Sequence, residues 1–299
     1  MSLSATGLVA FCSLQATPVQ AYEEDTHFLI TMVQCRAVGL TDAEALVVAS
    51  HDQGMDDSPG TVANDGPVPH IAEEQLWHAI PMNGTAAEVL KRKAELFAKV
   101  LAEKEPAMQL KRLGVFFHYQ QDTWAHRHHS NSHATNFNPF QVPLGHAKFG
   151  SQPDRPPFDP VCALRCLEEG VGFAKQFLSV CLKRTPNALF NNYQPASGSV
   201  DVNWNDSRKG ASFHQLKLDT STPARHFLTN LIRCQINAYT SSIDVNPNWF
   251  GNYTADEASY FQMGINLQGA CSLAQILVAF PANRQKITTL ITAQLGGKL

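Results

Sequence analysis

Apolar positions recur along this 299-residue chain with the spacing of amphipathic helices. Thr41–Asp42–Ala43–Glu44 and Thr85–Ala86–Ala87–Glu88 both have the Thr-x-x-Glu spacing of an N-terminal capping box. The first predicts a helix through Ser50, and the second predicts a helix toward Glu105 that Pro106 ends. Further helices are predicted over residues 107–126, 160–184, 223–242 and 255–279.

Long polar connections separate the predicted helices. Gly, Pro, Asn and Asp are abundant over residues 52–73, 131–160, 186–219 and 244–254. Loops of this length are uncommon in compact domains and are often functional, and the first two contain histidines and carboxylates. Because alternating strand-like patterns are scarce, we predict an all-α fold, a multi-helix bundle with long site-forming loops.

Histidines are concentrated in the first half of the chain. Ten of the twelve lie between His27 and His146. His118, Asp122 and His126 stand four residues apart, so a helix over residues 107–126 would present all three on one face. Imidazole and carboxylate are usual ligands of zinc. The spacing therefore predicts a metal site on this helix.

Charge and cysteine content narrow the class of protein only a little. The chain has 23 Lys and Arg against 26 Asp and Glu, and no basic cluster indicates a nucleic-acid-binding surface. A small substrate, or a short nucleic-acid strand in a metal-lined cleft, is compatible with this charge balance.

The seven cysteines lack zinc-finger spacing, and six would be left for disulfides if Cys12 were removed on export. Cys162 and Cys166, one helical turn apart, are expected to be buried apolar residues.

The first residues are typical of a segment removed on export. An apolar run from Ala5 to Leu14 precedes Val19–Gln20–Ala21, whose small residues suit signal-peptidase cleavage. We predict a signal peptide over residues 1–21, one mainly helical metal-binding domain over residues 22–299, and a secreted or periplasmic protein. Because Met1–Ser2–Leu3 is not basic, an N-terminal helix or strand packed on the domain is the alternative. No apolar run reaches the roughly 18 residues needed to span a bilayer.

Further candidate ligands precede and follow the histidine helix. They are His27, Asp52 in Ala49–Ser50–His51–Asp52–Gln53, His78 in Leu76–Trp77–His78, His146 in Gly145–His146–Ala147, and Asp154. With His118-x-x-x-Asp122, this order resembles the zinc-dependent phospholipase C and P1-type nuclease superfamily. The resemblance covers residues 22–160 and implies that family's helical fold and a cluster of three zinc ions.

The resemblance also implies roles for individual residues. Asp122 would bridge two metal ions, and Asp52 would both ligate an ion and orient the nucleophile. Tyr22 would bind zinc through its amine and carbonyl, in the place of the family's N-terminal Trp. Together, the resemblance and the spacing on the histidine helix give as candidate metal ligands His27, Asp52, His78, His118, Asp122, His126, His146 and Asp154.

The chain departs from the family pattern at two of these positions. The family's spacing after the helical Asp selects His128, whereas helical geometry selects His126, in an Asp-x-x-Ala-His form that some bacterial relatives share. The residue four positions after His146 is Gly150, so Asp154 or Asp159 would have to replace the family's carboxylate. The sequence is therefore compatible with a site for one or two ions as well as with a site for three.

Three other residues have open or lesser roles. His70 competes with His78 as a ligand. Asp56 and Asp57 are more typical of loop caps or of acceptors outside the ligand set. His and carboxylate ligands suit zinc, and also iron or manganese.

These residues favour a metal-dependent, phosphoesterase-like hydrolase. Zinc ions lower the pKa of a bound water and bind phosphoryl oxygens, and phospholipid or nucleic acid are the candidate substrates. One alternative is an HD-type phosphohydrolase that uses the adjacent pair His51–Asp52 with His27. The other is a non-catalytic metal-binding protein on the same fold.

Overall fold

A computed structural model of the chain describes residues 24–57, 61, 71–82, 84–128, 136–141, 160–187 and 190. No strand forms among these residues, which contain an isolated β-bridge between Arg127 and Pro139. The prediction of a mainly helical chain is therefore confirmed for this part, and the helices predicted over residues 223–242 and 255–279 lie outside it. The described helices are α1 (Glu24–Val38), α2 (Asp42–Asp57), α3 (Ile71–Trp77), α4 (Ala86–Ala102), α5 (Pro106–Ala125) and α6 (Pro160–Val180).

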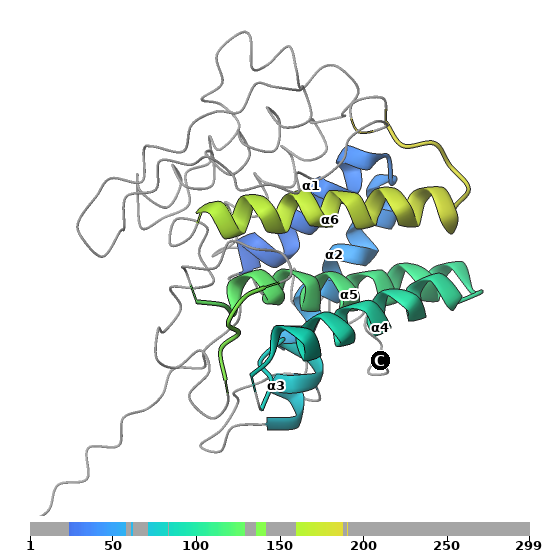
Figure 1. The fold of residues 1–299 in the computed structure, drawn as a ribbon. Helices are drawn as coiled ribbons and strands as arrows, with labels where there is room; N and C mark the ends of the chain where they lie inside the picture. Colours follow the sequence, from blue (N-terminus) through green and yellow to red (C-terminus); the bar gives the residue numbers. More distant parts are fainter. Residues whose placement is uncertain are drawn as a thin grey trace, which may run out of the picture.

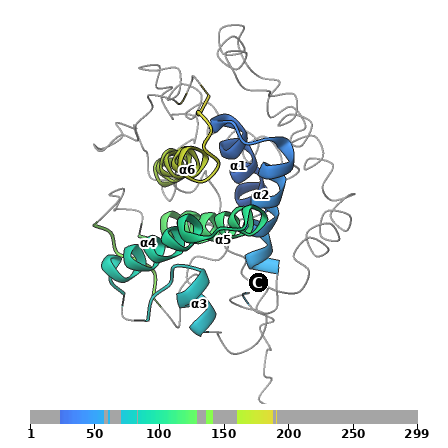
Figure 2. The same cartoon turned by 90° about the vertical axis from the view of Figure 1, so that its right-hand side faces the viewer.

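Helix α5 lies at the centre of this bundle, because each of the other five described helices contacts it. In Figure 1, α5 runs between α6 and α4. The view in Figure 2 places α1 and α2 on one side of α5, with α4 on the other and α3 below. Helix α1 also packs against both α2 and α6. In the described part, no helix combines the length and the apolar character that crossing a bilayer requires.

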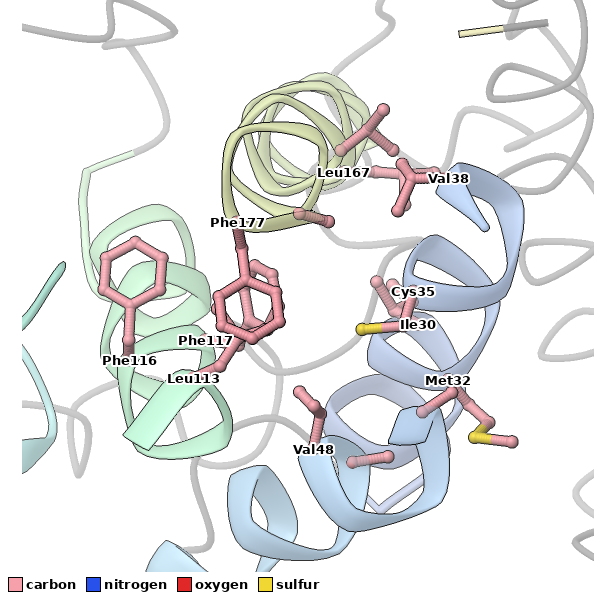
Figure 3. Close-up of a cluster of buried hydrophobic side chains, with 14 of the residues drawn as sticks. Ile30, Met32, Cys35, Val38, Val48, Leu113, Phe116, Phe117, Leu167 and Phe177 are labelled. Atoms are coloured by element: carbon pink, nitrogen blue, oxygen red, sulfur yellow. The ribbon is translucent and has the colours of Figure 1, made fainter. Parts of the chain in front are cut away.

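The hydrophobic core fills the space between α5, α6, α1 and α2 (Figure 3). Phe117 of α5 and Phe177 of α6 are fully buried there, and Ile30 and Cys35 of α1 and Val48 of α2 are buried on the side facing them. Burying a side chain of this size stabilises a fold by about 1.5–3 kcal/mol. The core thereby fixes α5 against the two N-terminal helices.

The start of α5 is set by a local cap. Glu105 accepts hydrogen bonds from the backbone N–H groups of Ala107 at 3.0 Å and Met108 at 2.6 Å, and Pro106 occupies the first turn. The helix predicted over residues 107–126 is thus confirmed within one residue at each end. The helix predicted before it ends at Ala102, three residues earlier than expected.

Helix α2 begins as predicted and ends later. Thr41 and Glu44 form both hydrogen bonds of a capping box, at 2.8 and 3.3 Å. The helix then continues to Asp57, although an end after Ser50 and a loop from residue 52 were expected. Helices α1 and α3 were not predicted from the hydrophobic pattern.

Helix α6 ends at Val180, four residues before the predicted end. Lys183 has a φ of 55°, a left-handed conformation that does not continue a helix. Cys162 and Cys166 are buried as predicted, and the four cysteines of the described part are free thiols.

A buried polar cluster joins α4, α5 and α6 on the side of α5 opposite α2. Glu169 accepts hydrogen bonds from Lys93 Nζ at 2.7 Å, Gln120 Nε2 at 2.9 Å and Trp124 Nε1 at 2.8 Å. Burial alone would raise the pKa of Glu169, but the ammonium of Lys93 and the three hydrogen bonds lower it below its ordinary value. Glu169 is therefore a charged carboxylate with its own donors.

Helices α2 and α5 cross in close contact at Gly114. A Cβ atom at this position would lie 2.3 Å from the backbone oxygen of Val48 and 2.7 Å from His51 Cβ. The backbone oxygen cannot give way, so only glycine allows this approach. The crossing brings the polar ends of both helices together beyond it.

We expect Gly114→Ala to lower the free energy of unfolding by about 1–3 kcal/mol, as overpacking does. In an open helical position the same change would stabilise the fold by roughly 1 kcal/mol. Gly170→Ala in α6 is the matched control, because its added Cβ meets the flexible end of Gln34. Urea unfolding measures both variants, and equal stability of Gly114→Ala and the wild type would contradict the close crossing.

Candidate metal centre

Six titratable side chains from four parts of the chain meet at the polar end of the α2–α5 crossing. The spacing of four residues places two carboxylates on one face of α2, and an imidazole and a carboxylate on one face of α5. All six residues are buried, with at most 5% of their surface exposed. They are His27 of α1, Asp52 and Asp56 of α2, His78 after α3, and His118 and Asp122 of α5.

His78 reaches the site from the short segment after α3. Its Nε2 donates a hydrogen bond to the carbonyl oxygen of Thr61 at 2.8 Å, since a carbonyl oxygen only accepts. Nδ1 is therefore the nitrogen that faces the site. It lies 3.1 Å from His118 Nε2 and 3.3 Å from Asp122 Oδ2.

His78, His118 and Asp122 form a group that could hold a metal ion. The third distance, from His118 Nε2 to Asp122 Oδ2, is 3.4 Å. Asp56 Oδ1 lies 3.6 Å from each of the two imidazole nitrogens. Four ligands about 2.0–2.2 Å from one zinc ion would be about 3.3–3.6 Å apart. The spacing of these atoms fits one ion.

His27 lies on the other side of the same two carboxylates. Its Nε2 is 3.6 Å from Asp56 Oδ2 and 3.5 Å from Asp122 Oδ1. His27, Asp56 and His118 form a second group that could hold an ion. Asp56 and Asp122 thus each turn one oxygen toward His78 and His118 and the other toward His27. The two groups share His118, and each contains one of the two carboxylates.

The imidazoles around Asp122 stabilise its carboxylate as an anion. Burial alone would raise its pKa, but His126, His118, His27 and His78 hold that pKa well below its ordinary value. Neither of its oxygens accepts a hydrogen bond. A buried carboxylate without donors is costly unless a cation compensates it, so this residue fits a metal ligand.

The three imidazoles differ in their affinity for protons. Burial lowers the pKa of His27 and His78, but the neighbouring carboxylates outweigh it: the pKa of His27 rises well above 6.5 and that of His78 rises to about 9. Burial dominates at His118, where the positive charge of His27 and His78 adds to it, and the pKa falls to about 4. A neutral His118 among three carboxylates is already in the protonation state that a metal ligand needs.

His126 lies beside this centre without belonging to either group. It is buried just past the end of α5, and its Nδ1 donates to the carbonyl oxygen of His78 at 2.6 Å. The same nitrogen is 3.8 Å from Asp122 Oδ2. His128 is exposed, and its ring meets the edge of Phe140 at 5.2 Å. Of the two candidates, His126 is therefore the one next to the site.

Sequence reasoning underestimated Asp56. It was interpreted as a loop cap or outer acceptor, yet it lies in α2 and faces His27, His78 and His118. The signal that could have found it is its spacing from Asp52, which equals that of His118 and Asp122. Asp52 itself lies inside α2 and not at a helix end as expected.

Four other candidates lie outside the described residues. They are His146 and Asp154, with the alternatives Asp159 and His70. Tyr22 also lies outside them.

His51 stands apart from the site, although it adjoins Asp52 in the chain. Its Nδ1 donates to the carbonyl oxygen of Val47, in its own helix, at 2.9 Å. Its Cβ faces Gly114 at the crossing with α5. Neither three-residue group in the described part includes it.

Comparisons of the chain with protein-family models, with curated proteins and with solved structures gave no match.

We expect the metal-free protein to lose stability as the pH rises from about 6.5 to about 9. A histidine whose pKa is raised by folding stabilises the fold below its unfolded pKa, and this contribution is lost as the pH passes the folded pKa. His78 and His27 both act in this direction, and each can change the unfolding free energy by about 1.4 kcal/mol per pH unit. His118 has a folded pKa of about 4, so its loss of a proton in the unfolded state opposes this slope only near pH 6.5.

Urea unfolding of chelator-treated protein at several pH values measures this slope. His78→Gln should reduce it. A free energy of unfolding that is constant or rises over the same range would contradict the placement of these imidazoles among carboxylates.

Proposed function

We propose that this protein is a metal-dependent, phosphoesterase-like hydrolase. The observation that carries the proposal is the pair of buried carboxylates, Asp56 and Asp122, each of which faces His78 and His118 with one oxygen and His27 with the other. Five ligands in this arrangement suit two ions a short distance apart, the geometry of many phosphodiester hydrolases.

When bound, such ions lower the pKa of a water molecule toward neutrality and bind phosphoryl oxygens. The protonation states of the site residues favour metal binding. His118 is neutral before a metal arrives, and Asp122 supplies a fixed negative charge. Burial of all these side chains excludes bulk water, which strengthens every charge interaction in the site. His126 fixes His78 by donating to its carbonyl oxygen.

Nitrogen and oxygen donors favour zinc, with iron and manganese as alternatives. The ordered series of His and Asp residues also supports the resemblance to the phospholipase C and P1-type nuclease superfamily, which would add a third ion. In that arrangement His146 and Asp154 would supply further ligands, and Tyr22 would add its amine. Phospholipids and nucleic acids are the substrate classes that we propose, for a protein exported after cleavage near Ala21.

The geometry favours this proposal over an HD-type phosphohydrolase. That site would require His51 and Asp52 to ligate the same ion together with His27. His51 instead bonds to Val47 of its own helix and faces the α5 crossing. The proposal of a non-catalytic metal-binding protein shares the same centre, so only turnover separates it from a hydrolase.

Hydrolysis of bis(4-nitrophenyl) phosphate by protein purified without chelators tests the proposed function. We expect turnover that chelation abolishes and zinc restores. Asp122→Asn should lower turnover by more than about 100-fold and should reduce bound metal, because losing a ligand costs more than losing an outer partner. His51→Asn, which can still donate to Val47, is the matched control and should retain metal and turnover.

Loss of metal in His51→Asn together with its retention in Asp122→Asn would favour the HD-type site. Bound metal without turnover on phosphodiesters and phosphomonoesters would favour the non-catalytic alternative.

A further inference from the structure

The rings of His27 and His118 each have one nitrogen on the metal side and one on the side of Asp52. The Nε2 atoms of both rings face Asp56 and Asp122 at 3.4–3.6 Å. Their Nδ1 atoms lie 3.1 and 3.5 Å from the same oxygen, Asp52 Oδ1. The two rings stack with centroids 4.3 Å apart. Asp52 thus lies beside both imidazoles, on the side of each ring that faces away from Asp56 and Asp122.

Gln121 determines which nitrogen of His27 carries the proton. Its Nε2 donates to Asp52 Oδ2 at 2.9 Å, and Thr31 Oγ1 donates to the same oxygen. If the amide of Gln121 were rotated by 180°, its oxygen would lie against the carboxylate of Asp52, and the two oxygens would repel each other. The amide oxygen therefore faces His27 Nδ1, at 2.9 Å. An amide oxygen only accepts. Nδ1 of His27 therefore carries a proton, and Nε2 is the nitrogen that faces Asp56 and Asp122.

The position of the proton on the second imidazole, His118, follows from two buried atoms without a hydrogen-bond partner among the described residues. His118 Nδ1 and Asp52 Oδ1 are both buried, and neither atom has a hydrogen-bond partner in the described part of the chain. They lie 3.5 Å apart. A proton on His118 Nδ1 would give this nitrogen an acceptor and would give Asp52 Oδ1 a second N–H beside that of His27 Nδ1, 3.1 Å away. The lone pair of His118 would then be on Nε2, the nitrogen that faces His78 and Asp122.

We propose that Asp52 is a positioning residue and not a metal ligand. With Thr31 and Gln121 it holds the Nδ1–H groups of His27 and His118, so that both rings bind metal through Nε2. This inference rests on the proposed metal centre. It also assigns Asp56, and not Asp52, as the α2 carboxylate that ligates the ions. Outer partners of this kind fix the orientation and tautomer of metal-binding histidines.

The contacts of Asp52 are those of an outer partner. Its Oδ2 is occupied by two donors, Thr31 and Gln121. An ion at its Oδ1 would need His27 Nδ1 as a ligand, but that nitrogen is committed to Gln121. The remaining nitrogen there, His118 Nδ1, would provide only one further ligand.

Two adjacent glutamines provide a matched pair of variants. Gln121→Leu removes the partner of His27 and Asp52, whereas Gln120→Leu removes a buried amide of the same size that bonds to Glu169 and to the carbonyl oxygen of Cys166. We expect Gln121→Leu to weaken zinc binding about 10–100-fold, the usual cost of losing an outer partner, with the number of ions per chain at saturation unchanged. Gln120→Leu should keep the wild-type zinc affinity even if it unfolds at lower temperature.

Competition with a chromophoric chelator measures these affinities without any substrate. Long-range ¹H–¹⁵N spectra of zinc-loaded protein with ¹⁵N-labelled histidine then report the tautomers directly. We expect His27 and His118 to carry protons on Nδ1 in the wild type, and Asp52→Asn to keep the full number of zinc ions at saturation.

Three results would overturn the inference. They are a proton on Nε2 of either ring, loss of one zinc ion per chain in Asp52→Asn, and equal zinc affinity in the two glutamine variants. Zinc binding with these tautomers but without turnover would refute the hydrolase and leave the positioning role standing. A wild type that binds no zinc would refute both.

Discussion

The burial of three carboxylates within reach of three imidazoles is the constraint on which the described structure depends. Removing a carboxylate from water costs several kcal/mol unless a partner compensates it. Asp52 has its donors in Thr31 and Gln121. Asp122 has none and is surrounded by four imidazoles instead. A cation would therefore complete the charge balance of the site, and the His and Asp groups here could hold a metal ion.

The rest of the bundle keeps these groups at fixed separations. Gly114 lets the backbones of α2 and α5 approach closely, and the aromatic core between α5 and α6 holds this crossing in place (Figure 3). The cluster around Glu169 fixes the opposite side of α5. Consecutive residues on α5 have divided roles as a result: Gln120 faces this cluster, and Gln121 faces the metal centre. Metal affinity and fold stability are consequently separable by mutation at these two positions.

The features that could be predicted from the sequence are those that depend on residues within one or two turns of the same helix. Thr41, Glu44 and Pro106 mark helix ends through contacts within one turn, and the His118–Asp122 spacing specifies one face of one helix. Helix α1 has no clear amphipathic period, because a stripe of polar residues, His27, Thr31 and Gln34, is buried along with its apolar residues. The sequence pattern alone cannot distinguish polar residues that are buried from polar residues that face solvent. The same reason explains the end of α2 that was placed too early.

The division of labour between Asp52 and Asp56 could not be predicted, because it depends on the angle at which α1 and α5 meet α2. Anomalous diffraction at the zinc edge, from crystals of protein purified without chelators, would locate any ion among these residues. We expect one ion bound by His78 and His118 and another beside His27, with Asp56 and Asp122 between them. Crystals with no ion among these residues, or with an ion held by His51 and Asp52, would contradict this expectation.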